Sequence, residues 1–232
     1  MDDIIVPETT LFTTKHKEFN AIRVSGQRLI PTKIKISADI IIDDIDTDLY
    51  ESQMAIGLSK CDFWIDHVVN NCIMFDISNV WALNSFMDDN GLPDVSNKIM
   101  LVPGEPNDAV LASLIQAKFN ALSDGAFDVG SVEISSTDGS LTFMFAGDGK
   151  GSLPTIEEWI GDHSYFSEPW WNRRDASTMD VAPDEDADLS NPPSFAFSLE
   201  FITEALWSSN LPSALIVRPE FRPHVIKGGR KD

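Results

Sequence analysis

Apolar residues recur along this chain with either the helical or the strand period. The clearest unit spans residues 98–122, where a short apolar run at 99–102 leads through a Pro-Gly turn to apolar residues at helical spacing. Asn107 and Asp108 stand in the first turn of that helix, where acidic and capping side chains are favoured. The pattern predicts a strand, a turn and a self-capped helix that serves as a structural core element.

The longest periodic stretch predicts a helix over residues 47–72. Its apolar positions follow each other in steps of three or four: Tyr50, Met54, Leu58, Cys61, Ile65, Val68 and Cys72. Gly57 lies inside the stretch and indicates a kink or close packing there. Two cysteines on one helix at this separation would be about 16 Å apart, beyond the ~7 Å limit for a disulfide. We therefore expect Cys61 and Cys72 to be free, buried thiols.

Alternation of apolar and polar residues predicts the strands. Residues 19–24 and 28–30 flank Ser25-Gly26 as a hairpin, which Pro31 is expected to interrupt. A separate strand follows at 33–40, with one apolar face made of Ile34, Ile36, Ala38 and Ile40. A second hairpin is predicted further along the chain from residues 129–135 and 141–146.

Shorter elements complete the expected fold. We predict a strand at 73–75, a helix from Ser78-Asn79 to Asn90-Gly91, a helix at 156–160 capped by Thr155, a helix after Pro192-Pro193, and a strand at 214–217. Residues 161–192 follow neither period and predict a long loop, and loops of that length are commonly functional or disordered.

Together these elements predict an α+β fold in which a mixed, mostly antiparallel sheet packs with about four to five helices. We expect an N-terminal arm or edge segment at 1–18, a single domain at 19–217 with the long loop near 161–192, and a basic C-terminal tail at 218–232. No apolar run approaches the roughly 18 residues of a membrane span, and the first residues lack the basic start of a signal peptide. A cytoplasmic protein with no membrane partner is expected.

The net charge of -20 is unevenly distributed. Residues 39–216 alone carry -25, whereas both ends of the chain have more basic than acidic residues. A field of this sign repels nucleic acid and acidic membranes, and it attracts basic partners. Direct nucleic-acid binding is therefore disfavoured, and a protein partner with a basic surface is favoured.

Candidate chemical motifs fail on spacing. Residues 147–152 superficially resemble a phosphate loop but lack the upstream glycine and place Gly151 after Lys150. Two carboxylate triplets, at 44–48 and 184–188, lack the sixth-position glycine and the final glutamate of a calcium loop. The four histidines show no zinc spacing. We assign no catalytic residue, no cofactor and no metal ligand from the sequence.

The most unusual local composition is Trp170-Trp171-Asn172-Arg173-Arg174, within an acidic stretch. Aromatic residues beside arginine are enriched at protein interfaces, so Trp170, Trp171, Arg173 and Arg174 are candidate partner-binding residues. In the alternative interpretation, both tryptophans fold inward and pin the loop, while the arginines neutralise nearby carboxylates.

Three functional hypotheses follow. The first is a non-catalytic protein-protein interaction or assembly protein, such as a viral or mobile-element assembly component, that contacts partners through the 161–192 loop and its terminal arms. The second is an acidic inhibitor or immunity-type protein that blocks a basic or nucleic-acid-binding site on an enzyme. The third is an enzyme whose carboxylate or histidine site is assembled in space. The sequence makes an enzyme less favoured than a non-catalytic protein, and it leaves open whether the protein forms homo-oligomers.

Overall fold

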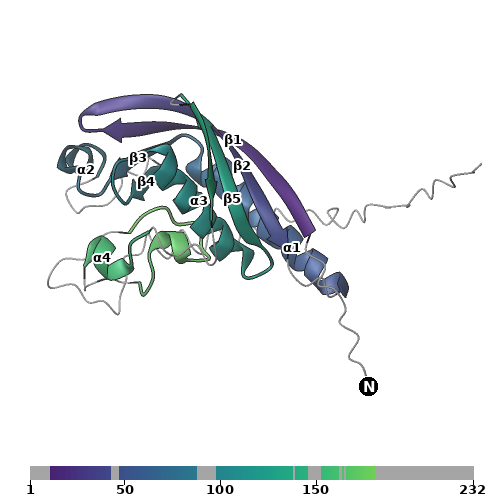
Figure 1. Cartoon of the computed structure of the whole chain (residues 1–232). Coiled ribbons are helices and arrows are strands. Elements are labelled where there is room, and N and C mark those ends of the chain that lie inside the picture. The colour runs from purple at the N-terminus through teal and green to yellow at the C-terminus, as the bar shows by residue number, and fades with distance from the viewer. Residues whose placement is uncertain are drawn as a thin grey trace, which may run out of the picture.

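A six-stranded mixed sheet organises the protein (Figure 1). The computed structural model describes residues 11–42, 47–87, 98–137, 139–145, 153–161, 164 and 166–180. In spatial order the strands are β4 (Ile99–Val102), β3 (Cys72–Asp76), β1 (Leu11–Ser25), β2 (Arg28–Ile42), β5 (Asp128–Ser136) and β6 (Gly139–Met144). The pairs β1/β2, β2/β5 and β5/β6 are antiparallel, and β1/β3 and β3/β4 are parallel. The predicted α+β class with a mostly antiparallel sheet is confirmed.

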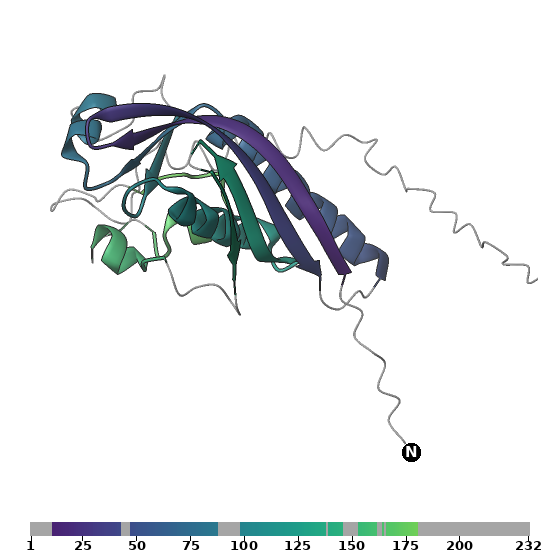
Figure 2. The same ribbon diagram turned by 45° about the horizontal axis from the view of Figure 1, so that its top comes forward.

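Four α-helices accompany the sheet in the described residues: α1 (Thr47–Phe63), α2 (Val80–Phe86), α3 (Asp108–Ser123) and α4 (Ile156–Ile160). A π-helix, η1 (Trp64–Val69), continues α1, and a 3-10 turn, η2 (Trp170–Asn172), lies in the late loop. The sheet arches over α1 and α3 (Figures 1 and 2). The segment with α4 and η2 lies on the other side of α3, so α3 is central.

The β1–β2 hairpin is longer than the sequence predicts. Its two-residue turn contains Gly26 at a φ of 58°, a backbone conformation that suits glycine. Pro31 was expected to interrupt the hairpin, but β2 runs through it to Ile42. Pro31 lies opposite Ile22 at a non-hydrogen-bonded position of the ladder, and β5 pairs with β2 only from Lys35 onward. No ladder bond therefore needs the missing N–H.

Residues 11–18, assigned from the sequence to an arm or edge segment, form the first half of β1 and pair with β2. Lys15 and Lys17 in this half bind Asp62 of α1, and Lys17 also binds Asp66 of η1. These ion pairs fasten the long hairpin to the helix beneath it.

The predicted helix over 47–72 ends earlier than expected, and Cys72 belongs to β3. After α1 the helix continues as the wider π-helix η1. Asn71, with a φ of 66°, then connects it to the strand β3. The helix itself ends at Asn70, the extended C-cap of η1, and asparagine at position 71 tolerates the left-handed backbone that follows better than most residues. The expectation that both cysteines share one helix is wrong, but both thiols are free and buried as predicted.

The core lies between the sheet and its helices. Ile34, Ile36, Ala38 and Ile40 are buried on one face of β2, as their alternation predicts. The helix predicted after 99–102 is α3, with Asn107 as its N-cap, and it is buried on nearly every side. At its first turn, Asp108 forms a buried ion pair with Arg23 of β1.

Most of the remaining predictions agree where the structure describes them. The strand at 73–75, the helix capped by Asn79, the β5–β6 hairpin and the capping box of Thr155 in α4 are all present. The helix predicted to run to Asn90-Gly91 is shorter than expected, because α2 ends at Phe86 and Met87 is its extended C-cap. The helix after Pro192-Pro193, the strand at 214–217 and the tail at 218–232 lie outside the described residues. No helix in the described ranges is long and apolar enough to cross a membrane.

Gly57 allows close packing of α1 on the C-terminal end of α3. A Cβ atom there would lie 3.0 Å from Cε1 of Phe127 and 3.2 Å from Cα of Ser123. We expect Gly57→Val to lower the free energy of unfolding by about 2 kcal/mol through overpacking, measured by urea denaturation. Ala55→Val, at an exposed position of the same helix, should cost no more than about 0.5 kcal/mol. Equal losses in the two variants would contradict this packing.

Candidate functional site

Residues 166–180 lie along strand β4 and the underside of α3. The backbone N–H of Leu101 donates to the carbonyl of Thr178, and the Thr178 hydroxyl donates to the carbonyl of Ile99. The indole N–H of Trp170 donates to the carbonyl of Leu101 at 2.9 Å. These bonds cover the edge of the sheet at β4.

Both adjacent tryptophans are buried in the core. Trp170 packs against Trp64 and meets Trp171 edge to face, with 5.5 Å between the ring centroids. Trp171 in turn packs against Trp159 of α4. The four indoles connect η1, η2 and α4, so the pair holds the loop to the core, as the alternative interpretation describes.

Arg173 is enclosed by groups of its own segment. Its guanidinium pairs with Asp175 and Asp180, donates to the Ser177 hydroxyl and to the Glu168 carbonyl, and stacks 3.9 Å from the ring centroid of Phe166. The second carboxylate oxygen of Asp180 accepts the backbone N–H of Trp170 at 2.8 Å. Arg173 thus sets the shape of the turn between Trp170 and Asp180.

Lys118 of α3 completes this buried cluster. Its ammonium donates to the carbonyls of Trp170 and Arg173 at 2.8 and 2.9 Å and lies 3.4 Å from a carboxylate oxygen of Asp175. Three partners match the three donors of an ammonium group. Complete burial lowers the pKa of Lys118 to about 8, against the opposing attraction of Asp175.

The Asp175 carboxylate is held in its charged form. Burial alone would raise its pKa, but the charges of Lys118 and Arg173 and hydrogen bonds from Ser177 outweigh burial and lower the pKa to about 2. Two cations and two carboxylates therefore balance inside the cluster of Lys118, Arg173, Asp175 and Asp180. With its donors and acceptors engaged by neighbouring protein groups, this cluster has a structural role.

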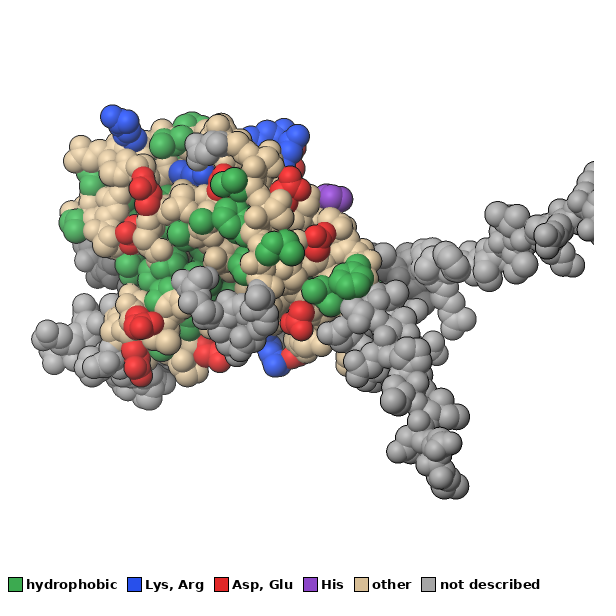
Figure 3. Space-filling view, viewed as in Figure 1, with side chains coloured by type: hydrophobic (Ala, Val, Ile, Leu, Met, Phe, Trp, Pro, Cys, Tyr) green, Lys and Arg blue, Asp and Glu red, His purple; other side chains and the backbone are tan. Residues whose placement is uncertain are grey.

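A groove of about 960 Å³ opens beside the cluster. It lies between α3, the start of β5, the end of β6 and residues 166–180, which we call the docked loop. Its lining is mixed. Apolar side chains come from Ala117, Ala121, Val129, Phe145, Leu153 and Trp171, and polar ones come from Gln116, Asn120, Thr155 and Asn172. Its rim carries the charged side chains of Asp124, Asp128, Glu168 and Arg174. Three carboxylates thus face one guanidinium, and acidic side chains are visible below the sheet on this face (Figure 3).

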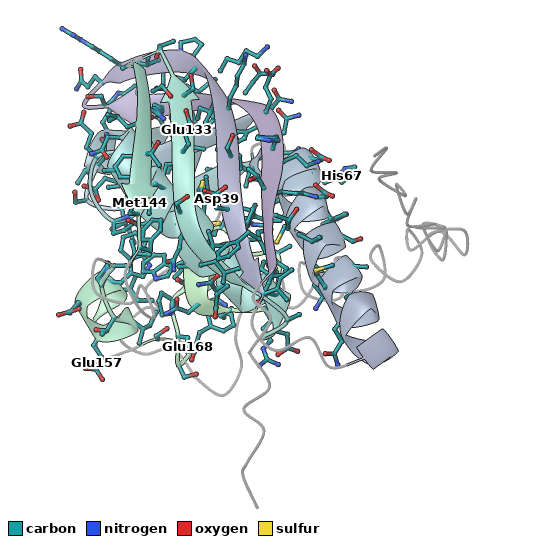
Figure 4. All side chains as sticks on the ribbon, turned by 45° about the vertical axis from the view of Figure 1, so that its right-hand side comes forward. Asp39, His67, Glu133, Met144, Glu157 and Glu168 are labelled. Carbon is teal, nitrogen blue, oxygen red and sulfur yellow. The ribbon has the colours of Figure 1, made fainter. Side chains whose placement is uncertain are left out.

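The rim is solvated, in contrast to the cluster. Arg174 pairs with Asp124 at 2.7 Å, with 70% and 50% of the two side chains exposed. Glu168 lies below the sheet, beside α4 (Figure 4). Asn120, on the groove wall, uses its side-chain oxygen to accept the backbone N–H of Val129 at 2.9 Å. The geometry offers a mixed apolar and polar surface bordered by negative charge.

The structure separates the four residues that the sequence singled out. Trp171 and Arg174 line the groove, whereas Trp170 and Arg173 lie in the buried cluster. The carboxylates of the rim were not anticipated, since they come from a helix end, a strand start and the loop. Lys118 was also missed, although a lysine in a helix that is apolar on all sides is a signal for a buried cation.

The histidines and cysteines do not approach the groove in the described residues. His16 shares a hydrogen bond with Ser37 on the outer face of the sheet, and His67 packs on Phe63. Burial raises the pKa of Cys61 far above its usual range and that of Cys72 to about 12, so neither thiol is a nucleophile. His163, His224, the phosphate-loop resemblance, Asp44, Asp46 and the carboxylates at 184–188 lie outside the described residues.

Comparison with known proteins gives little similarity. No protein-family model and no curated protein matches the chain. Among solved structures, the uncharacterized protein WS1659 from Wolinella succinogenes shares 12% sequence identity with a TM-score of 0.39, covering 59% of this chain and 98% of that chain. A similarity of this size supports no argument about the present protein.

Removal of the Asp180 carboxylate should destabilise the protein strongly. Asp180→Ala leaves the Trp170 backbone N–H and one N–H of Arg173 Nη1 without their acceptor and removes a buried charge partner of Arg173. We expect a loss of about 3 kcal/mol in the free energy of unfolding. Arg174→Ala breaks the exposed pair with Asp124, leaves the left-handed backbone at Asp124 unchanged, and should cost no more than about 0.5 kcal/mol. Urea denaturation of both variants measures the contrast, and similar losses would refute the structural role of the cluster.

The stability contributed by Asp175 should depend on pH. Because its folded pKa is lowered from 3.8 to about 2, the contribution is present above pH 4 and is lost as the pH falls toward 2. We expect wild type to exceed Asp175→Asn in the free energy of unfolding by about 2 kcal/mol more at pH 6 than at pH 2. Denaturation curves of both proteins across this range test it, and a pH-independent difference would exclude the assigned ion pairing.

Proposed function

We propose that the protein is a non-catalytic protein-interaction module that receives a basic segment of a partner protein in the groove beside α3. The observation that carries this proposal is the combination of apolar side chains in the groove with three carboxylates and one arginine at its rim. From the sequence, the tryptophans of the 161–192 loop were candidate partner-binding residues. Because they are buried, we now propose that the partner binds in the groove that the docked loop helps to form.

Size and charge support this assignment. A volume of about 960 Å³ accommodates several side chains, which suits a short peptide segment. The net charge of -20 adds a long-range attraction for a basic partner and would accelerate association. The partly exposed apolar side chains of the groove, Phe145 and Leu153, would contribute affinity through burial of their remaining apolar surface.

The chemical groups near the groove favour binding over catalysis. In the described residues the titratable side chains on its rim are carboxylates and Arg174, with no histidine or thiol beside them. The donors and acceptors of Lys118, Arg173, Asp175 and Asp180 are already engaged by each other and by Trp170, Ser177 and Glu168. An enzyme with a spatially assembled carboxylate or histidine site stays the third hypothesis, and the carboxylates of the rim are the groups that it would use.

An acidic inhibitor or immunity-type protein is the second candidate, favoured by the overall charge. Such a protein would present carboxylates over a broad surface to a basic site on an enzyme. The two proposals differ in where the contact lies: the groove in the first, and the acidic surface as a whole in the second.

Charge reversal on the rim should separate the proposals. We expect Asp128→Lys combined with Glu168→Lys to weaken binding of the native partner at least about 10-fold, or about 1.4 kcal/mol, because both side chains border the groove. The matched control is Glu18→Lys combined with Glu133→Lys on the exposed outer face of the sheet. Affinity purification of the full chain from its native source, followed by titration of the recovered partner, gives the measurement.

The groove proposal requires that the control variant bind like wild type and that added salt weaken binding. Equal weakening by both variants would favour the broad acidic surface of an inhibitor. Full binding by the Asp128/Glu168 variant would remove the groove from consideration.

A further inference from the structure

The two edge strands of the sheet, β4 and β6, differ in whether other described residues cover them. At β4 the backbone is bonded to Thr178, and Trp170 adds a third bond, so the docked loop covers that edge. At β6 the described residues place no partner along the outer side of the strand. Figure 4 shows β6 as the margin of the sheet, with Met144 on it.

The register of the β5–β6 hairpin identifies the free groups. Ser136 and Gly139 close the two-residue turn, and Phe145 donates to the Gly130 carbonyl at 2.9 Å, so alternate residues of β6 face β5. The N–H and C=O groups of Ser140, Thr142 and Met144 therefore point away from the sheet. These are the groups with which another strand pairs.

Strand β6 lacks the usual protection of an exposed edge. Natural edge strands carry lysine, proline or a bulge that blocks pairing, but residues 139–145 contain no charged residue and no proline. Leu141 is 57% exposed and Met144 is 79% exposed, both as large apolar side chains. Hydrophobic side chains also reach the surface elsewhere on the face that carries β5 (Figure 3).

Charge selects the occupant of this edge. In a two-fold symmetric dimer, each surface patch lies opposite the same patch of the second copy. A chain with net charge -20 can therefore self-associate only through a patch where like charges do not face each other. Strand β6 meets this condition. In the described residues the carboxylate beside β6 is that of Glu133 on β5, which accepts a hydrogen bond from the Ser140 hydroxyl of β6. In a β6–β6 pairing Glu133 would be three strand spacings, roughly 14 Å, from its counterpart, beyond the ~8 Å Debye length at physiological salt.

We propose that β6 pairs with β6 of a second copy of this chain, antiparallel and centred on Thr142, to form a continuous twelve-stranded sheet from two six-stranded ones. Thr142 lies opposite itself, and Ser140 lies opposite Met144 of the other copy, which gives six hydrogen bonds from the free groups. On the helix side of the sheet, Leu141 of each copy lies beside Phe143 of the other. This contact buries apolar surface of Leu141 that a single copy leaves exposed.

Cross-linking tests the register in the full chain. The Cα atoms of two Thr142→Cys residues would be about 5.5 Å apart, whereas those of two Ser140→Cys residues would be about 14 Å apart. A bis-maleimide too short for the longer distance should yield covalent dimers of Thr142→Cys and leave Ser140→Cys monomeric. The native cysteines are buried and should not react. Equal cross-linking of both variants would overturn the proposed register.

A proline variant tests the edge itself. Thr142→Pro removes an N–H that faces away from β5, so the hairpin tolerates it while pairing with a second copy is lost. Thr142→Val keeps the N–H and is the matched control. By sedimentation analysis we expect wild type and Thr142→Val to dimerise and Thr142→Pro to remain a folded monomer by circular dichroism.

Salt gives a further signature, because it screens repulsion between two acidic copies. The dimer fraction should rise with salt, the opposite of the dependence expected for a basic ligand in the groove. A wild type that stays monomeric at 200 µM in high salt would overturn the proposal. So would protection of the Ser140, Thr142 and Met144 amides from hydrogen exchange in a monomer, since another segment would then cover the edge.

Discussion

The buried contact between Lys118 and the turn of residues 170–175 is the interaction on which the late part of the structure depends. One ammonium on the central helix binds two backbone carbonyls and a carboxylate of a segment that has little regular structure of its own. Burial of a charge is costly unless the charge is paired and hydrogen-bonded. The arrangement of the segment that pairs and hydrogen-bonds the Lys118 ammonium is therefore strongly stabilised over others. Arg173 and Asp180 then complete the charge balance and position Trp170.

This arrangement has consequences on both sides of the segment. Toward the sheet, it brings the carbonyl and hydroxyl of Thr178 to β4 and closes an edge. Toward solvent, it brings Trp171, Glu168 and Arg174 to one wall of the groove. The same docking event therefore stabilises the sheet and creates the surface to which we assign partner binding, so a loss of the cluster should affect both.

Charge is distributed to match these roles. Inside the cluster the signs balance, and around the groove negative charge is in excess. Along β6 the charged side chains are absent. A strongly acidic body favours basic partners wherever its field is exposed and permits contact with its own copy only at a neutral strip. The groove and the β6 edge are thus suited to different partners and to opposite responses to salt.

Periodicity in the chain was sufficient for much of the fold. The alternation at 33–40 and the spacing after Asn107 predicted buried faces because each depends only on which residues of one element are apolar. Pro31 and Cys72 were misassigned for reasons outside that pattern. Whether a proline is tolerated in β2 depends on which of its residues hydrogen-bond to the neighbouring strands. The helix ends where Asn70 becomes extended and Asn71 turns left-handed. The Trp-Arg composition at 170–174 marked an unusual segment but could not reveal which side chains turn inward. Only folding brings Lys118 to the turn and gathers Asp124, Asp128 and Glu168 around one groove, because residues distant in sequence become neighbours through packing rather than through any local signal.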